Sequence, residues 1–413
     1  MKEHNVVVTI TTLVLLTILS PSTWSQSSFR TLYTFSGGSA GSQPFSGLVM
    51  DKFGNLYGTT YVGGGGTCLG QGCGIVFELL PKKHEQSVTS WQEAVLYTFN
   101  SEDGANPQTA SLVIDKHGNL FGTTEFGGTG NTGVAYQLSR KGSHPWTEQV
   151  IYRFTGQTGV NPVDNLTFDD EGNLYGTTSD WSGGFTGPGT IFKLTPERGG
   201  NWTKTVLHTF NGADGFNPSS GVVFDNQGNL YGTTIYGGQY NQGVVYRLSP
   251  NPDGTWTEGV LHHFSGSDDG FRPQAGLMRD EFGNLFGVTA FGGANGYGTV
   301  YRLKRGDDIW AFNTLYAFRA GEDGANSFAS LVMDSSGALY GTTHDGGIYA
   351  CGVVFKLTPD MNDNWHESVI HTFDNKPDCE AFGPLILDSM GNLYGTTRGD
   401  GTTTFGSVFE ITP

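Results

Sequence analysis

The side chains best suited to chemistry follow seven copies of a short sequence that is centred on glycine and ends in threonine. Directly after each copy the seven sequences stop agreeing, and the positions there are occupied by Tyr61, Glu125, Asp180 with Trp181, Tyr236, Phe291, His344 and Arg398. Aromatic and hydrogen-bonding side chains of these types can stack on a sugar or a peptide and orient it. We therefore expect a glycan-binding or protein-binding surface here. The alternative is that these loop tips are polar and variable only because they are exposed.

Two constellations within this set could also catalyse a reaction. Glu125 and Asp180 could serve as the carboxylate pair of a glycoside hydrolase, which requires a separation of about 5 to 9.5 Å. His344 is followed by Asp345 and could act as an oriented base of a lyase or lactonase. The sequence does not fix either geometry, and adjacent residues often point apart. We favour a non-catalytic binding module, with an extracellular carbohydrate-active hydrolase, lyase or lactonase as the alternative.

The elements that must position these residues recur along the chain. Seven aspartates open copies of Asp-x-x-Gly followed by the glycine-centred sequence, at positions 51, 115, 169, 225, 280, 334 and 388. A fixed period near 55 residues is typical of repeat folds. The fourth copy contains four apolar runs separated by turn residues, at 222–224, 230–234, 244–248 and 260–264. We interpret each copy as four short strands.

Seven units of four antiparallel strands predict an all-β fold, a seven-bladed β-propeller. A parallel β-helix is the competing fold, but it would not need the tight Asp-x-x-Gly turn. The segment 29–35 resembles a fourth strand and 406–411 a third strand. We therefore expect the N-terminal strand to complete the last blade and to remove the exposed edges of an open array. The glycine in mid-strand predicts close approach of a neighbouring backbone or ring.

Several other residues are interpreted as structural. The turn aspartates fit a hairpin role, because the carboxylate accepts a backbone N–H two residues on and no copy has the spacing of a calcium-binding loop. His208, His262 and His371 occupy a tyrosine position of the fourth strand, so we expect them to be packing residues. No metal site is predicted. No cofactor is expected either, because the glycine-rich loops lie between strands and not ahead of helices.

Charge and the first residues bear on location. The formal net charge is −17 and charged residues make up 15% of the 413 residues, which makes nucleic acid and anionic membranes poor partners. Residues 6–19 contain only Val, Ile, Leu and Thr, a stretch too short to span a bilayer but suited to a secretory signal. We expect a signal peptide at 1–25, one propeller domain at 26–413, no membrane association after cleavage, and a secreted (extracellular or periplasmic) monomer.

The four cysteines fit an exported chain, where disulfides form. Four cysteines allow three connectivities, and position in the repeat favours Cys68 with Cys73 and Cys351 with Cys379. The second pair is expected because loops after second and fourth strands open on one face of a meander. No Cys-x-x-Cys redox motif is present, and no histidine lies at zinc-ligand spacing from a cysteine.

The Gly-Asn-Leu-Tyr-Gly-Thr-Thr core, followed by Gly-Gly and a Val-Phe strand, resembles the GloVer (Gloeo-Verruco) tandem repeat of exported bacterial proteins of unknown activity. The resemblance covers residues 29–413 in seven copies. The Asp-x-x-Gly-Asn-Leu-Tyr element is more loosely similar to propellers of the NHL and gluconolactonase kind. The resemblance implies a propeller and brings no catalytic residues. Members often carry a C-terminal anchor, whereas this sequence stops at Pro413 after its last strand, so surface anchoring is not expected.

Overall fold

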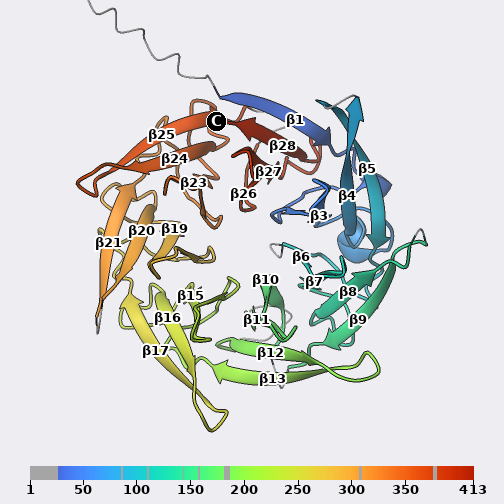
Figure 1. Ribbon diagram of the computed structural model, residues 1–413, viewed down its shortest axis with the longest axis horizontal. Helices are drawn as coiled ribbons and strands as arrows, with labels where there is room; N and C mark the ends of the chain where they lie inside the picture. The colour runs from blue at the N-terminus through green and yellow to red at the C-terminus, as the bar shows by residue number, and fades with distance from the viewer. Residues whose placement is uncertain are drawn as a thin grey trace, which may run out of the picture.

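The computed structural model describes residues 27–84, 87–108, 111–142, 144–156, 159–180, 187–306, 309–374 and 379–413. Seven four-stranded antiparallel sheets form a closed ring around a central axis (Figure 1). The all-β seven-bladed propeller is thereby confirmed. The expected signal peptide at 1–25 lies outside the described residues.

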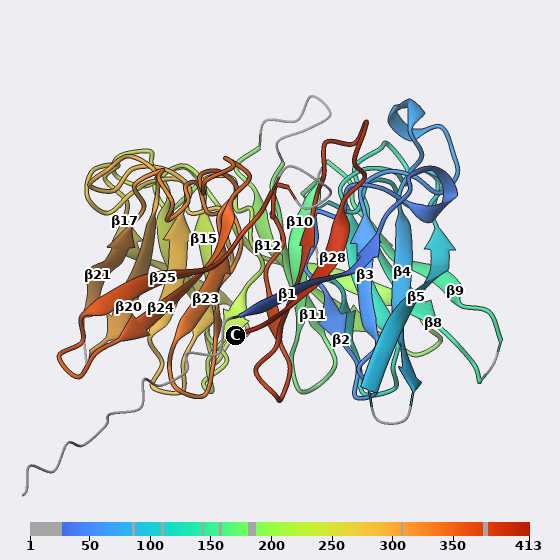
Figure 2. The same cartoon turned by 90° about the horizontal axis from the view of Figure 1, so that it is seen from above.

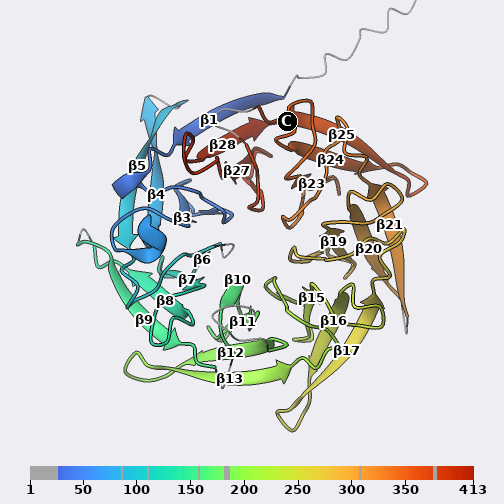
Figure 3. The same cartoon turned by 180° about the vertical axis from the view of Figure 1, so that it is seen from behind.

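Each blade runs from an inner strand near the axis to an outer strand at the periphery of the propeller (Figures 1 and 3). Blade 1 contains β2 (Val49–Met50), β3 (Leu56–Thr60), β4 (Ile75–His84) and β5 (Ser87–Thr98); blade 2 contains β6 (Val113–Ile114), β7 (Leu120–Thr124), β8 (Val134–Ser139) and β9 (Thr147–Arg153). Blade 3 contains β10 (Pro162–Phe168), β11 (Leu174–Thr178), β12 (Thr190–Pro196) and β13 (Trp202–Thr209); blade 4 contains β14 (Val223–Phe224), β15 (Leu230–Thr234), β16 (Val244–Pro250) and β17 (Trp256–His263).

The remaining blades repeat this order. Blade 5 contains β18 (Met278–Arg279), β19 (Leu285–Thr289), β20 (Thr299–Arg305) and β21 (Trp310–Ala317); blade 6 contains β22 (Val332–Met333), β23 (Leu339–Thr342), β24 (Val353–Pro359) and β25 (Trp365–Thr372). Blade 7 contains β26 (Ile386–Leu387), β27 (Leu393–Thr397), β28 (Ser407–Thr412) and the N-terminal β1 (Ser28–Thr34). Two 3₁₀ turns, η1 (Gly38–Ala40) and η2 (Cys68–Gly70), lie in loops.

The turn between the first two strands is held by its aspartate. In blade 4, one oxygen of Asp225 accepts the backbone N–H groups of Gln227 and Asn229, both at 2.9 Å. The other oxygen accepts the amide of Asn229 at 2.8 Å and the hydroxyl of Tyr231 at 2.9 Å. Gly228 takes the left-handed conformation with φ +81°, which costs glycine little. This arrangement confirms the hairpin role of the aspartate.

The mid-strand glycine makes room for an aromatic ring. A Cβ on Gly58 would lie 2.6 Å from Cζ of Phe77 on the neighbouring strand. Every blade repeats this packing of a third-strand Phe or Tyr over the glycine. The expected close approach is therefore confirmed, and it fills the centre of each sheet with a ring that is fully buried.

Tryptophan joins one blade to the next. Trp146, which precedes β9 in blade 2, packs edge-on against Tyr57 of blade 1 with ring centroids 6.4 Å apart. The same contact joins Trp310 to Tyr231 at 5.8 Å and Trp365 to Phe286 at 6.1 Å. Burial of such large rings supplies much of the hydrophobic free energy that holds the ring together.

The ring is closed by the N-terminal strand, as predicted. β1 pairs antiparallel with β28, with Ser28 opposite Thr412 and Thr34 opposite Ser407. Figure 2 shows β1 crossing the outer side of β28. The main difference from expectation is length. In blades 2 to 6 the fourth strand begins at or next to its tryptophan, and in blade 1 it begins earlier, at Ser87. The reason is that the two outer strands form a long hairpin, which continues on both sides of a bulge directly before the third-strand aromatic residue.

Both expected disulfides are present. Cys68 bonds Cys73 within the loop after β3, and Cys351 before β24 bonds Cys379 in the loop after β25. The second bond confirms that loops after second and fourth strands share a face. The 3₁₀ turn η2 lies at the upper edge of the ring in Figure 2, which identifies that face; we call it the loop face.

Candidate functional site

A cavity of about 410 Å³ opens on the propeller axis. Its lining comes from the segment that leads into the first strand in six blades and from the start of β10 in blade 3. The lining residues are Phe45, Gln108, Val163, Ser219, Gln274, Ala275, Gly276, Phe328, Ala329, Ser330, Phe382 and Pro384. Because all seven blades contribute, the cavity lies where the blades converge. Phenylalanines of blades 6, 7 and 1 form one side, and amides and a hydroxyl of blades 2, 4 and 5 contribute to the other.

One backbone position sets this lining in every blade. In each blade, the residue two positions before the first lining residue has a left-handed backbone conformation, with φ between 54° and 62°. These seven residues are Gln43, Asn106, Asn161, Asn217, Arg272, Asn326 and Glu380. Its carbonyl accepts the N–H of the residue that follows the second strand, as in the 3.0 Å bond from Tyr61 to Gln43 and the 2.9 Å bond from Arg398 to Glu380. The variable loop position is thereby fixed to the cavity rim. We call the seven left-handed residues, and not the loop residues that they bind, the rim positions.

Asparagine is the commonest rim residue, and its side chain connects blades. The amide of Asn106 donates to the carbonyl of Tyr61, and that of Asn161 donates to the carbonyl of Glu125, each at 2.9 Å. Asparagine tolerates the left-handed conformation better than other residues with a Cβ. Gln43, Arg272 and Glu380 depart from this pattern, and the two charged residues among them make contacts of another kind.

Arg398 and Glu380 form the charged part of the site. Nη1 of Arg398 donates to Oε2 of Glu380 at 2.9 Å. The guanidinium also lies over Phe45, with Cζ 4.8 Å from the ring centroid, and within 5.9 Å of Phe382. Cation–π contacts of this kind contribute about 0.5–1 kcal/mol at exposed sites. The pair therefore holds Arg398 directly against two lining phenylalanines.

His344 joins the same group from blade 6. Its ring lies 4.4 Å from Phe382 and 5.6 Å from Phe328, measured between centroids. Nε2 lies 3.8 Å from Oε2 of Glu380, and Nδ1 lies 3.0 Å from the carboxylate of Asp345. The side chains of His344 and Asp345 thus lie close together, although that short contact lacks hydrogen-bond geometry.

Tyr61 and Glu125 approach from blades 1 and 2. The Tyr61 ring packs edge-on against Phe45 at 5.3 Å. Burial, together with the charge of Glu125, raises the pKa of Tyr61, while Arg398 acts in the opposite direction. Burial raises the pKa of Glu125 to about 7. The Glu125 carboxyl group can therefore retain a proton near neutral pH.

The remaining candidate residues from the sequence analysis make other contacts. One oxygen of Asp180 accepts the backbone N–H of Val160 at 2.6 Å, so this carboxylate ties the loop after β11 to the segment that leads into β10. Tyr236 and Phe291 flank Arg272, whose Cζ lies 5.2 and 5.6 Å from their ring centroids. Trp181 lies outside the described residues. No contact in the described part of the chain joins Asp180 to Glu125.

Sequence reasoning missed the residues that line the cavity itself. None of the predicted loop residues lines it; Tyr61, Phe291, His344 and Arg398 instead contact rings that do or pack beside them. The signal was present in the Asn-Pro dipeptides at 106, 161 and 217, which recur before first strands. Asparagine favours the left-handed conformation and proline cannot donate a hydrogen bond, so the recurrence marks a fixed backbone turn.

Comparison with known structures agrees with the fold. A candidate 6-phosphogluconolactonase from Bacteroides uniformis superposes with a TM-score of 0.52 at 12% identity, covering 80% of this chain and 85% of the other. An ancestral GH74 enzyme gives a TM-score of 0.54 at 12% identity, covering 90% of this chain and 51% of the enzyme. A candidate gluconolactonase gives 0.45 at 13% identity, covering 94% and 92%. At these identities the first two likenesses show the fold alone.

Sequence comparison is more specific. No curated protein matches the chain. The model of the Gloeobacter/Verrucomicrobia repeat matches residues 65–281 and 251–413, which together cover most of the sequence and contain the glycine-centred repeats of blades 2 to 7. The match agrees with the repeat resemblance stated from the sequence. The chain belongs to the Gloeobacter/Verrucomicrobia repeat family.

Proposed function

We propose that this protein is a non-catalytic binding module that holds a glycan at the axial cavity of its loop face. The observation that carries the proposal is the two-sided lining of that cavity. Phe45, Phe328 and Phe382 are adjacent, with ring centroids 5.3 and 5.6 Å apart, and the other side carries Gln108, Ser219 and Gln274.

This lining suits a sugar ring for a simple physical reason. A pyranose has an apolar face of C–H groups and a periphery of hydroxyls. Contact with the phenylalanines removes the C–H face of the sugar from water, while the amides and the hydroxyl of the lining replace the water that the sugar hydroxyls lose. A cavity of about 410 Å³ falls within the range of small-molecule sites, so it accommodates one or two sugar units with the remainder of the glycan outside.

The departures at the rim positions add support. A residue with a Cβ in the left-handed conformation costs roughly 1–2 kcal/mol, and asparagine relieves part of that cost. Glu380 and Arg272 nevertheless occupy this conformation, with φ of 62° and 54°. Strain of this kind clusters at functional sites. The side chain of Glu380 holds Arg398 against Phe45 and Phe382. At that place the guanidinium can bind sugar hydroxyls or a uronic carboxylate.

A second candidate function is carbohydrate cleavage. It is favoured by Glu125, because a carboxyl group with a pKa of about 7 retains its proton at neutral pH and suits a general acid. The weakness of this candidate lies in the partner: Asp180, the other carboxylate of the expected pair, is bonded to Val160. Binding without turnover is therefore the better-supported function.

Export is part of the proposal. The two disulfides suit an oxidising compartment, and the apolar stretch at 6–19 suits a secretory signal. No helix among the described residues is long and apolar enough to cross a membrane. A monomer outside the cytoplasm, in the periplasm or the extracellular space, is the expected form.

The test combines a glycan array with a polysaccharide-degradation screen on the mature chain. A hit is then titrated calorimetrically against wild type, Phe382→Ala and a matched control, Phe282→Ala. Phe382 lines the cavity, whereas Phe282 is 76% exposed in the first hairpin turn of blade 5. We expect Phe382→Ala to weaken binding at least tenfold and Phe282→Ala to leave it unchanged.

Two outcomes contradict the proposal. Release of reducing ends from a polysaccharide, lost in Glu125→Gln, would favour the enzyme. Equal affinity of wild type and Phe382→Ala for every bound glycan would place the binding surface away from the axis.

A further inference from the structure

The blade junctions contain a second repeated arrangement that is unrelated to the axial cavity. A tyrosine or histidine of one fourth strand meets an acid of the following loop, and the fourth strand of the next blade adds a third side chain. Tyr97 donates to Asp103 at 2.6 Å and Tyr316 donates to Asp323 at 2.7 Å. The third side chains at these junctions are Glu148 and Glu367.

Where histidine replaces tyrosine, the third side chain usually changes as well. His262 bonds Asp269 at 3.1 Å and stacks on Phe312, with ring centroids 3.9 Å apart and planes within 10°. His371 stacks on Phe29 at 3.8 Å. These contacts confirm both histidines as packing residues.

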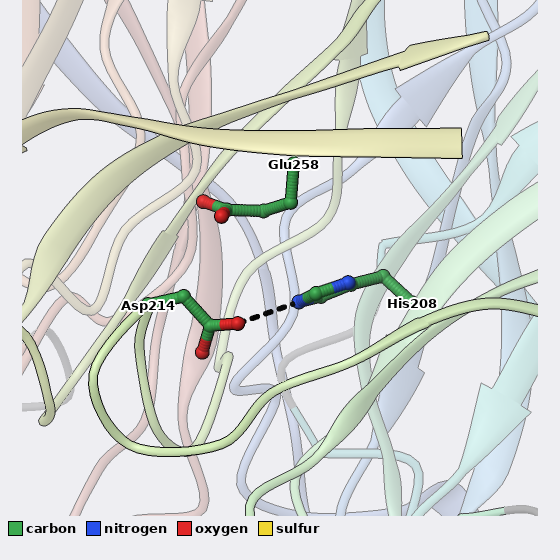
Figure 4. A group of neighbouring side chains, drawn as sticks. All are labelled: His208, Asp214 and Glu258. Atoms are coloured by element: carbon green, nitrogen blue, oxygen red, sulfur yellow. Dashed lines mark hydrogen bonds and ion pairs between the residues drawn. The ribbon is translucent and has the colours of Figure 1, made fainter. Parts of the chain in front are cut away.

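The His208 junction is the exception, because its third side chain is a glutamate, as at the Tyr97 and Tyr316 junctions. Nε2 of His208 lies 3.1 Å from Oδ2 of Asp214, and Glu258 of β17 faces the same point. One ligand atom from each residue lies within 4.8 Å of the other two. Figure 4 shows the three side chains approaching one another from separate segments. Within the described ranges this is the one group of three such ligands.

We propose that His208, Asp214 and Glu258 bind a divalent cation of the zinc class between blades 3 and 4. One imidazole nitrogen and two carboxylate oxygens form a zinc ligand set, with bonds near 2.0–2.2 Å and a fourth position for water. Three atoms within 4.8 Å of one another reach that geometry through small side-chain rotations. The phenol–carboxylate junctions at Tyr97 and Tyr316 lack an imidazole, and the His262 junction lacks the second carboxylate.

Two further observations support the site. Oε1 of Glu258 is buried and makes no hydrogen bond with any described group, a state that it shares with Glu93, Glu148 and Glu367. Among the described residues, only at the Glu258 junction does a histidine complete a ligand set, so that coordination would relieve this cost. Asp214 is oriented by Asn211, whose backbone N–H and side-chain amide donate to its two oxygens at 2.8 and 2.9 Å. Such outer hydrogen bonds accompany metal ligands and fix their direction. The side chains of His208 and Asp214 are 19% and 13% exposed, so an ion can enter from solvent.

The chain supplies its own matched variants for the test. His208→Tyr recreates the Tyr97 type of junction, and Glu258→Phe recreates the His262 type, so both variants should fold. His262→Tyr serves as the control because it removes a histidine from a junction without a second carboxylate. The mature chain, freed of metal by a chelator, is titrated with Zn²⁺ by calorimetry, and Co²⁺ is then added as a spectroscopic probe.

We expect wild type and His262→Tyr to bind one Zn²⁺ and to unfold about 2–5 °C higher with saturating metal. His208→Tyr and Glu258→Phe should lose that stoichiometric binding and that rise, and with them the visible Co²⁺ spectrum. Absence of Zn²⁺ binding by wild type overturns the proposal. Equal binding by wild type and both junction variants overturns it too, because the ion would then lie elsewhere.

Discussion

Half-buried glutamates recur on the outer strands of the ring. Glu93, Glu148, Glu258 and Glu367 each carry an oxygen that is buried and without a hydrogen-bond partner among the described residues. Burial is the main cause that raises the pKa of each of them. In the absence of a bound cation the blade junctions therefore favour the neutral carboxyl group, and a cation at Glu258 has to displace that proton.

Glu367 gives the first prediction. Burial and the nearby Asp323 raise its pKa from 4.5 to about 7, against the opposing charge of Arg319. Between these two pH values the unfolded chain loses the proton first, so the stability that this group contributes at low pH is lost as pH rises through about 7. Glu367→Gln cannot ionise. Its unfolding temperature relative to wild type should therefore increase from pH 5 to pH 8 in calorimetric scans.

Exposed Glu281 provides the control for that experiment. Glu281→Gln, in the first hairpin turn of blade 5, should show no such pH trend. A constant difference between Glu367→Gln and wild type across the pH range would mean that Glu367 is ionised in the folded protein.

Glu380 gives the second prediction, which rests on its strained backbone. Asparagine occupies the equivalent rim position in four blades. Glu380→Asn should leave the free energy of unfolding equal or raise it by up to about 1 kcal/mol, because the ion pair with Arg398 is only partly buried, with both side chains 32% exposed, and contributes little. Glycan affinity should fall about tenfold as Arg398 loses its partner. Denaturant unfolding and calorimetric titration measure the two quantities, and a clear loss of stability would assign Glu380 a structural role instead.

At the scale of the element, each sheet is built around a glycine and a ring. A Cβ on Gly232 would lie 2.6 Å from Cζ of Tyr246, whereas a Cβ on Gly259 of the same blade meets nothing within 4 Å. The third prediction is that Gly232→Ala lowers the free energy of unfolding by about 1–3 kcal/mol. Gly259→Ala should be neutral or stabilising. Equal effects in denaturant unfolding would contradict the packing role of Gly232.

The disulfide at Cys351 and Cys379 positions the site as well as the fold. Cys379 directly precedes Glu380, whose N–H bonds the carbonyl of Cys351 at 3.2 Å. Replacing both cysteines with alanine should cost about 3 kcal/mol by the loop-entropy model and should weaken glycan binding. The same change at Cys68 and Cys73, in the loop of blade 1, is the control: we expect a stability loss with unchanged affinity. Thermal unfolding and titration separate the two effects.

The elements were largely predictable from the sequence because their signals are local. The Asp-x-x-Gly turn, the glycine under a ring and the strand-marking tryptophans each act within one repeat or between neighbours. The site was less predictable. Phe45 lies hundreds of residues from Phe328 and Phe382 in the sequence, and only the closed ring brings it next to Phe382. Their sequence neighbours vary, so no repeated pattern identified them beyond the Asn-Pro dipeptides of three other blades.

At the scale of the whole molecule, closure of the ring by β1 is the feature on which all seven blades depend. Phe29 of β1 stacks on His371 of blade 6 and lies 5.6 Å from Phe409 of blade 7. The fifth prediction is that removal of residues 27–34 exposes the edge of β28 and causes aggregation. A circular permutant, with residue 413 linked to residue 27 and new ends in the β16–β17 turn, should remain monomeric and unfold cooperatively. Light scattering and thermal unfolding measure both.

The rim positions also affect how this scaffold can change. Their carbonyls make backbone hydrogen bonds whatever the side chain, and the seven blades already hold four residue types there, so these positions can vary while the strands stay the same, at the cost that the left-handed conformation imposes. Each blade contributes its own residue to one shared opening. A library randomised at these seven sites would sample many alternative recognition surfaces on one frame, which makes the propeller a starting point for selecting new binders.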